Sequence, residues 1–280
     1  MKKIIFIFVF LIFCFFNAFS QEAEEIYDKG YEAMVKKDWK TAANYYEEYI
    51  RLKPESPRGY VSLGAAMLEL KQNETAFKLF NKAIEVDPTF AKAYSSRGAV
   101  YLIFGEKEKA EADLMKSIML DSTDASAWST LAVLYIVNKD EEKGLECYNT
   151  ALRQNPKAID VYWNRGAYYL TRDKYDLALL DVEKAMEILP NSAKNYYFRG
   201  TIYKYQNRLE DALKDFNKAV ELDPDDAECF LRRGILLSKM GEYSKALEDF
   251  EKSYKMNPDL KDQTIDYYKE TLEKWEKSKK

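Results

Sequence analysis

The side chains that most often perform catalysis are scarce in this chain of 280 residues. It contains no histidine, which excludes Ser-His-Asp and Cys-His nucleophiles and the zinc sites that need an imidazole. The sequence carries no glycine-rich phosphate-binding loop and no cluster of metal ligands. Cys147 and Cys229 fall on different predicted helices, so we expect two thiols rather than a disulfide. We therefore predict a protein without enzymatic activity, catalytic residues, metal or cofactor.

One pattern of charges does recur, at a spacing of 16 residues. Four arginines are each followed by an aspartate at this spacing: Arg97 and Asp113, Arg165 and Asp181, Arg199 and Asp215, and Arg233 and Asp249. Where leucine takes the arginine position, at Leu63 and Leu131, the later residue is uncharged as well (Leu79, Cys147). The two positions change together because a buried charge without a partner is costly. We expect each Arg–Asp pair to form a structural salt bridge between two helices.

The elements that hold these pairs follow from a period of 34 residues. Six prolines stand on this grid, with Ser122 in its vacant slot: Pro54, Pro88, Pro156, Pro190, Pro224 and Pro258. Counting the proline as position 32 gives seven repeats without insertion or deletion: 23–56, 57–90, 91–124, 125–158, 159–192, 193–226 and 227–260. A period of this length is typical of stacked helical repeats.

Four positions in these repeats indicate how two helices pack. Positions 8 and 20 are glycine or alanine in every repeat, whereas positions 4 and 24 are large or branched apolar residues. Small residues let two antiparallel helices approach closely, and the proline prevents the second helix from continuing. Each repeat is therefore predicted to be a helical hairpin, which buries its apolar faces by stacking on its neighbours.

These residues resemble the tetratricopeptide repeat (TPR). The pattern is carried in the fourth repeat by Trp128, Leu131, Ala132, Tyr135, Ala151 and Pro156, and the resemblance covers residues 23–260. It implies an all-α, right-handed superhelical solenoid of antiparallel helix hairpins, with a concave groove that binds peptides or partner helices. It does not extend to the carboxylate clamp of some relatives, because only Asn164 and Lys194 match the clamp's pattern.

The side of each first helix that turns away from the core is expected to line this groove. It carries small and hydroxyl residues in repeats 3 and 4, but aromatic and basic residues in repeats 5 to 7. Exposed aromatic residues on a concave face are the usual anchors of a binding site. The candidate partner-binding residues are Trp163, Asn164, Lys194, Tyr197, Phe198, Tyr205 and Arg232. The alternative is that Trp163 and Phe198 pack between adjacent helices.

The two ends of the chain differ from the repeats. Residues 1–20 combine a basic start, an apolar run and small residues before Gln21, which is typical of an export signal cleaved near Ser20. An uncleaved inner-membrane anchor is the alternative. Residues 261–280 are expected to form a C-terminal capping helix. Its predicted apolar face consists of Ile265, Tyr268, Leu272 and Trp275.

The charge balance limits the class of partner. The net charge is −4, and it becomes −6 if residues 1–20, which hold Lys2 and Lys3, are removed. Nucleic acids and anionic membranes require basic patches, so neither is expected as a partner. A small-molecule substrate is not expected either. The sequence thus predicts a module for protein or peptide partners in the bacterial cell envelope, in the periplasm or outside the cell. The alternatives are a scaffold for outer-membrane assembly or secretion, and a self-assembling structural stack.

Overall fold

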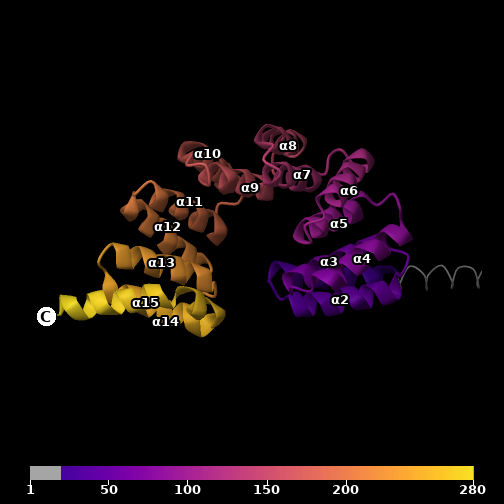
Figure 1. Cartoon of the computed structure of the whole chain (residues 1–280). Helices are drawn as coiled ribbons and strands as arrows, with labels where there is room; N and C mark the ends of the chain where they lie inside the picture. Colours follow the sequence, from indigo (N-terminus) through magenta and orange to yellow (C-terminus); the bar gives the residue numbers. More distant parts are fainter. Residues whose placement is uncertain (1–19, 280) are drawn as a thin grey trace, which may run out of the picture. The chain divides into compact units, whose positions relative to one another are not determined.

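The computed structural model describes residues 20–279, which are helical apart from short turns (Figure 1). Residues 20–35 form the first described helix. The helices that follow are α2 (Trp39–Leu52), α3 (Pro57–Glu69), α4 (Asn73–Val86), α5 (Ala91–Ile103), α6 (Lys107–Leu120), α7 (Ala125–Val137), α8 (Glu141–Gln154), α9 (Ile159–Leu170), α10 (Tyr175–Ile188), α11 (Ala193–Tyr205), α12 (Leu209–Leu222), α13 (Ala227–Lys239), α14 (Tyr243–Met256) and α15 (Asp259–Ser278).

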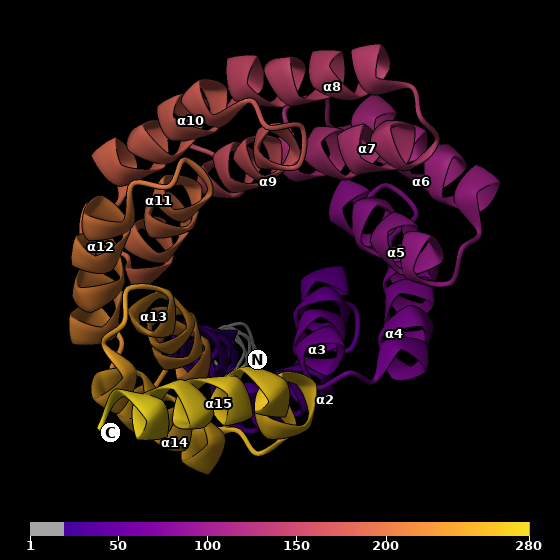
Figure 2. The ribbon, with the colours of Figure 1, turned by 60° about the vertical axis from the view of Figure 1, so that its left-hand side comes forward.

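The chain divides into two compact units. The N-terminal unit ends at Pro156 and contains residues 20–35 and α2 to α8, and the C-terminal unit begins at Lys157 and contains α9 to α15. Consecutive helices pair as hairpins within each unit. In each unit, the first helices of the hairpins form one layer and the second helices form the other (Figure 2). The predicted all-α stack of helix hairpins is thereby confirmed.

Every hairpin turns through one residue with left-handed backbone at position 15 of the repeat. The residues there, with their φ angles, are Lys37 (58°), Lys71 (62°), Gly105 (77°), Lys139 (65°), Asp173 (56°), Asn207 (59°) and Gly241 (85°). Only glycine adopts this conformation without a steric penalty from a Cβ atom. The tight turn is therefore imposed by the packing of the two helices, whichever residue the sequence supplies.

The second helix of each repeat ends two residues before position 32. Position 32 is a proline in six repeats, and helices end readily ahead of proline. Helix α6 ends at the same place although Ser122 replaces the proline. There the Asp121 carboxylate accepts a hydrogen bond from the Thr123 amide at 2.9 Å, which stabilises the same local turn that Asp87 and Thr89 form around Pro88.

Close approach of the two helices depends on the small residue at position 8. A Cβ atom added to Gly64 would lie 2.4 Å from the Phe80 ring, and one added to Gly30 would lie 2.7 Å from the Tyr46 ring. Both rings are buried at position 24 of their repeats. The large residue thus fills the space that the missing side chain leaves, which explains why the two columns occur together.

Helix α15 covers the last hairpin. Leu260 is buried in the apolar cluster of α13 and α14, and the Thr271 hydroxyl lies 2.7 Å from the Ser238 hydroxyl. The four residues of the predicted apolar face, Ile265, Tyr268, Leu272 and Trp275, are half-buried. The helix begins at Asp259, two residues before the predicted start, so Leu260 extends the apolar face.

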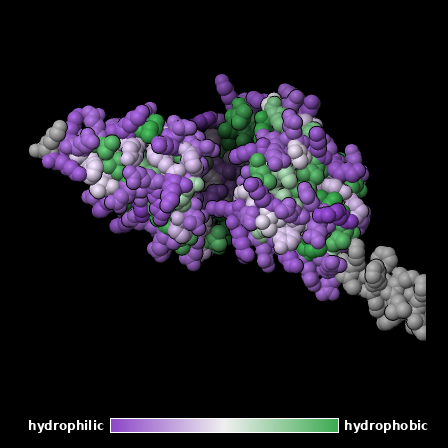
Figure 3. All heavy atoms as spheres, turned by 90° about the horizontal axis from the view of Figure 1, so that it is seen from below, coloured by the Kyte–Doolittle hydropathy of each residue, from purple (hydrophilic) through white to green (hydrophobic). Residues whose placement is uncertain are grey.

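The predicted export signal lies outside the described residues, apart from Ser20. Among residues 20–279, no helix combines the length and the apolarity needed to cross a membrane. The face of the molecule drawn in Figure 3 is mostly hydrophilic, with apolar side chains in small groups among charged ones.

Candidate protein-binding face

The candidate residues all lie on first helices of the C-terminal unit, α9, α11 and α13 (Figure 2). Asn164, Lys194 and Tyr205 are exposed, and Tyr205 is the most exposed of the aromatic ones at 56%. Trp163 and Arg232 are half-buried on the same layer. We call the surface formed by these five residues and Tyr197 the aromatic–basic face.

Trp163 is held in place by the next hairpin. Its indole Nε1 donates a hydrogen bond to Asn195 Oδ1 at 2.7 Å, and the Lys194 ammonium lies 3.5 Å from the centre of its ring. Asn195 is fully buried, and its Nδ2 also donates to the carbonyl oxygens of Ala185 and Leu189. The indole is therefore fixed in orientation, with one face covered by a cation.

Sequence reasoning did not identify Asn195, although a signal was present. It occupies position 3, where five other repeats carry glycine, alanine, valine or cysteine and the first carries glutamate. An asparagine in a mostly small, buried column needs hydrogen-bond partners. The Trp163 indole and two carbonyl oxygens supply them.

Tyr197 and Arg232 adjoin one another from α11 and α13. The Tyr197 ring centre lies 6.0 Å from that of Phe216, and burial raises the pKa of its hydroxyl, so this group stays protonated. Arg232 Nε donates to Glu228 Oε2 at 3.1 Å. Burial disfavours the charged guanidinium, but Tyr197 and Glu228 outweigh it and the pKa of Arg232 is raised.

The structure places Phe198 differently from the other candidates. Its ring packs against the cluster of Ala178, Val182 and Ile202, and a Cβ atom added to Gly166 would lie 2.9 Å from its Cε1 atom. The ring therefore fills the contact between the fifth and sixth repeats. Of the two interpretations considered for Phe198, packing between helices accounts for this position.

Two ranges of the chain match known protein families. Residues 28–232 match the family described as the cilia and flagella-associated protein 70 C-terminal domain, a TPR family, and residues 227–260 match the tetratricopeptide repeat itself. The chain belongs to this TPR family. TPR scaffolds bind protein partners and are typically non-enzymatic. No curated protein matches the chain.

Solved structures similar to this TPR protein share its fold. The "APC/C hetero-tetramer Cut9-Hcn1" aligns with a TM-score of 0.66 at 15% identity, over 90% of this chain but 47% of the other, so this chain spans about half of that length. A TPR protein from Parabacteroides merdae aligns with a TM-score of 0.59 at 21% identity, over 90% of this chain and 99% of the other. A TPR protein from Thermus thermophilus gives a TM-score of 0.59 at 20% identity, over 65% of this chain and 99% of the other.

The four expected Arg–Asp pairs are present in the TPR hairpins as bidentate salt bridges. Arginine Nε lies 2.6–3.0 Å from one carboxylate oxygen and Nη2 lies 2.6–2.8 Å from the other. Rings at positions 4 and 11 flank three of the guanidinium groups; for Arg199 they are Tyr196 and Tyr203, at 5.7 and 5.8 Å. Arg233 has a ring at position 4 alone, Phe230 at 5.4 Å, because position 11 of its repeat is Leu237. These pairs join the two helices of one repeat.

Two of these arginines also contact the preceding repeat, which sequence reasoning missed. Arg97 Nη1 donates to Asn81 Oδ1 at 2.7 Å, and Arg233 Nη1 donates to Asn217 Oδ1 at 3.0 Å. Both asparagines stand at position 25, 16 residues before the arginine. A spacing of 16 residues therefore separates each of these arginines both from the aspartate of its own repeat and from the asparagine of the preceding repeat.

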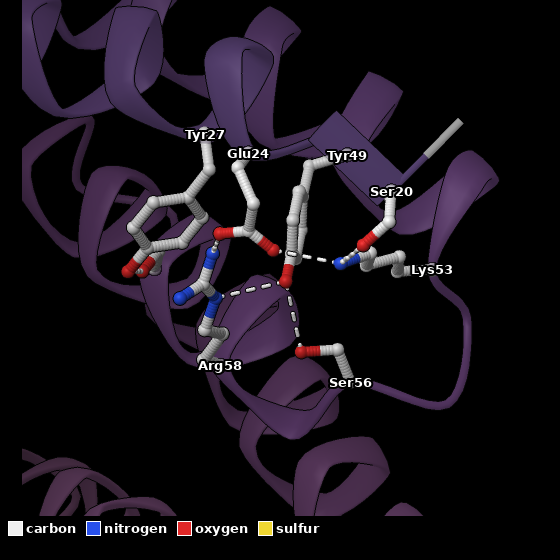
Figure 4. Close-up of polar contacts among 8 residues, drawn as sticks. Ser20, Glu24, Tyr27, Tyr49, Lys53, Ser56 and Arg58 are labelled. Atoms are coloured by element: carbon white, nitrogen blue, oxygen red, sulfur yellow. Dashed lines mark hydrogen bonds and ion pairs between the residues drawn. The ribbon is translucent and has the colours of Figure 1, made fainter. Parts of the chain in front are cut away.

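A second polar cluster ties the first described helix to the repeats (Figure 4). Glu24 forms ion pairs with Lys53, at 2.7 Å, and with Arg58. The Arg58 guanidinium also lies 4.0 Å from the Tyr27 ring centre and donates through Nε to the Tyr49 hydroxyl at 2.8 Å. These contacts join residues 20–35, α2 and α3, so we assign the cluster a structural role.

Cys147 and Cys229 are both buried thiols, as expected from their separation in the sequence. Burial raises the pKa of Cys147 to about 11, which keeps it in the unreactive thiol form. Among residues 20–279, no three cysteine, aspartate or glutamate side chains converge as a metal site.

Proposed function

We propose that this TPR protein binds a protein partner, as a peptide segment or a helix, on the aromatic–basic face. The observation that carries the proposal is the Lys194 ammonium 3.5 Å from the ring centre of the half-buried Trp163, with Tyr205, 56% exposed, at the other end of the same helix as Lys194. Tryptophan, tyrosine and arginine are enriched among the residues that supply most of the binding energy at protein interfaces. The Arg–Asp pairs and the Glu24 cluster stabilise the repeats that present this face.

The test is capture of a partner by crosslinking in the native cell. We expect the variant Lys194→Ala/Tyr205→Ala to lose the crosslinked partner, because both side chains are exposed and neither supports the core. Leu180→Ala is the matched control, since Leu180 is 57% exposed but lies on α10 in the second-helix layer. Circular dichroism would verify that all variants are helical. Capture of the same partner by the double variant would refute the proposal.

We further propose that the protein acts outside the cytoplasm, in the cell envelope. The basic start and apolar run of residues 1–20 support this location. Fusion of residues 1–20 to a reporter that is active only after export tests it, with Lys2→Glu/Lys3→Glu as the control. N-terminal sequencing of the native protein would give Gln21 after cleavage, or Met1 for an uncleaved anchor. A reporter that stays inactive would contradict export.

The family match supports a second location. Its description names a cilia and flagella-associated protein, and the match begins at residue 28, beyond the proposed signal. Cell fractionation separates the two locations. Within the envelope, a scaffold role in outer-membrane assembly or secretion would give a partner from that machinery in the crosslinking experiment. A self-assembling stack would instead give a molecular mass that rises with protein concentration in size-exclusion chromatography.

A further inference from the structure

Three cations gather at one end of the aromatic–basic face. Lys204 lies in the last turn of α11, and Arg232 and Lys239 lie on α13. The Lys239 ammonium donates to Asn207 Oδ1 at 3.1 Å, three residues after Lys204, and the charges of Arg232 and Lys239 each disfavour the charged form of Lys204. We call Lys204, Arg232 and Lys239 the basic cluster.

Lys204 is the unusual member of the basic cluster, because it replaces an apolar residue. It stands at position 12, which is Met34, Leu68, Leu102, Ile136 or Leu170 in the five preceding repeats. All five are half-buried, and so is Lys204. Burying an ammonium where the fold accepts a leucine is unfavourable unless an anion compensates it.

The described part of the chain does not supply an anion that would compensate Lys204. Within residues 20–279 its ammonium forms no hydrogen bond or ion pair, and its nearest ring is that of Tyr205, at 5.0 Å. Burial, followed by the charges of Arg232 and Lys239, lowers the pKa of Lys204. An added negative charge at this position would relieve both effects.

The neighbouring groups leave the basic cluster with excess positive charge. The Lys239 ammonium donates to the neutral Asn207 side chain at 3.1 Å, and Arg232 pairs with Glu228. Apart from Arg199 and Arg233, which are paired with Asp215 and Asp249, α11 contains two basic and no acidic residues, and α13 contains two basic residues and one acid. Helix α12, in the other layer, contains four acids and two lysines. Excess positive charge is therefore concentrated on α11 and α13 of this acidic protein.

We infer that Lys204, Arg232 and Lys239 form an anion-binding site for an acidic segment of the protein partner, an inference that rests on the proposed function. Three cations match the carboxylates of one or two acidic side chains. Nucleic acid is the poorer fit, because binding a phosphate backbone requires a longer array of cations than this acidic chain provides. The protonated Tyr197 hydroxyl beside Arg232 adds a hydrogen-bond donor for the same carboxylates.

The direct test is binding of a fluorescein-labelled oligoglutamate peptide to the full chain, followed by fluorescence anisotropy. We expect binding that weakens with added salt, because exposed charges are screened. Lys204→Leu is expected to weaken it by about tenfold or more, since it removes the half-buried cation. The matched control is Lys214→Leu on α12, whose side chain is 80% exposed. It should change the affinity by about twofold at most.

Loss of fold cannot imitate this result. Leucine occupies position 12 in three other repeats, so Lys204→Leu should unfold at the same urea concentration as the wild type or at a higher one. Three results would overturn the inference: oligoglutamate binding no tighter than oligoglutamine, equal affinities for Lys204→Leu and wild type, or displacement of the peptide by a lower concentration of single-stranded DNA.

The crosslinking experiment separates this inference from the proposed function. Capture that is lost in both Lys194→Ala/Tyr205→Ala and Lys204→Leu supports both. Capture that is lost in the double variant but retained in Lys204→Leu leaves the proposed function standing and refutes the acidic segment. Capture retained in both refutes the proposed function itself.

Discussion

Removing one member of the Arg199–Asp215 ion pair should destabilise its hairpin. The Arg199 side chain is 25% exposed and that of Asp215 is 7% exposed, so removing the arginine leaves a buried carboxylate without its partner. We expect Arg199→Leu to lower the free energy of unfolding by about 2–4 kcal/mol, the range for breaking such a pair with partial exposure. Urea titration followed by circular dichroism measures this change.

The second repeat indicates which second substitution would compensate for the loss of Arg199. It carries Leu63 and Leu79 where the sixth carries Arg199 and Asp215. The double variant Arg199→Leu/Asp215→Leu should therefore recover to within about 1 kcal/mol of the wild type. A double variant as unstable as Arg199→Leu would show that the pair does more than neutralise its own charges.

The turn within each hairpin contains a residue with a positive φ angle, which affects its stability. Lys139 has a φ of 65°, a conformation that penalises any side chain with a Cβ atom. We expect Lys139→Gly to raise the free energy of unfolding by up to about 1 kcal/mol, measured by urea titration. Gly105→Ala, with a φ of 77°, is the converse change and should destabilise by a similar amount. Equal stability of both variants and the wild type would show that the turns are relaxed.

The capping helix α15 contributes a buried leucine to the last apolar cluster. Leu260 is 6% exposed, so Leu260→Ala should lower the free energy of unfolding by about 2–4 kcal/mol through the cavity that it leaves. Tyr267, on the same helix, is 51% exposed, and Tyr267→Ala is the control with little expected effect. Differential scanning calorimetry compares the two melting temperatures. Similar losses in both would indicate that α15 contributes by helicity rather than by burial.

The whole molecule is a series of local contacts, so disturbances at one end should remain there. Most helices in each unit contact mainly the helices next to them in the sequence. We expect Leu260→Ala to reduce amide protection against hydrogen exchange in α13 to α15 and to leave α2 to α4 unchanged. Loss of protection along the entire chain would show cooperative unfolding of the array.

Acid provides the matching disturbance at the N-terminal end. The hydrogen bond from Lys53 and the charge of Arg58 lower the pKa of Glu24 from its usual value of 4.5. The carboxylate therefore stabilises the docked helix above pH 4.5, and this contribution is lost as the pH falls through the lowered pKa. Urea titrations near neutral pH and below pH 4.5 should show a loss of stability in acid that is smaller in Glu24→Gln than in the wild type, since other carboxyl groups with a lowered pKa, such as Asp87 and Asp121, remain. Glu22→Gln, at an exposed residue, should show the same loss as the wild type.

The sequence by itself determined the hairpin stack and the ion pairs. Each repeat presents the same contacts at the same spacing, so the 34-residue period, the small residues at position 8 and the Arg–Asp spacing define the packing within a repeat. The period also predicted where helices end, because proline and the local Asp121 turn act through neighbouring residues alone. Local rules repeated seven times are readable without a structure.

Only the tertiary structure decided which of the candidate partner-binding residues are exposed and which pack between repeats. Helical periodicity placed Phe198 and Tyr205 on the same side of α11, but Phe198 packs on Gly166 of the preceding repeat while Tyr205 is 56% exposed. The partners of Asn195 and the burial of Lys204 among cations emerged in the same way. The physical reason is that the exposure of a side chain between hairpins depends on which residues the neighbouring repeat brings against it, and spacing along one helix does not contain that information.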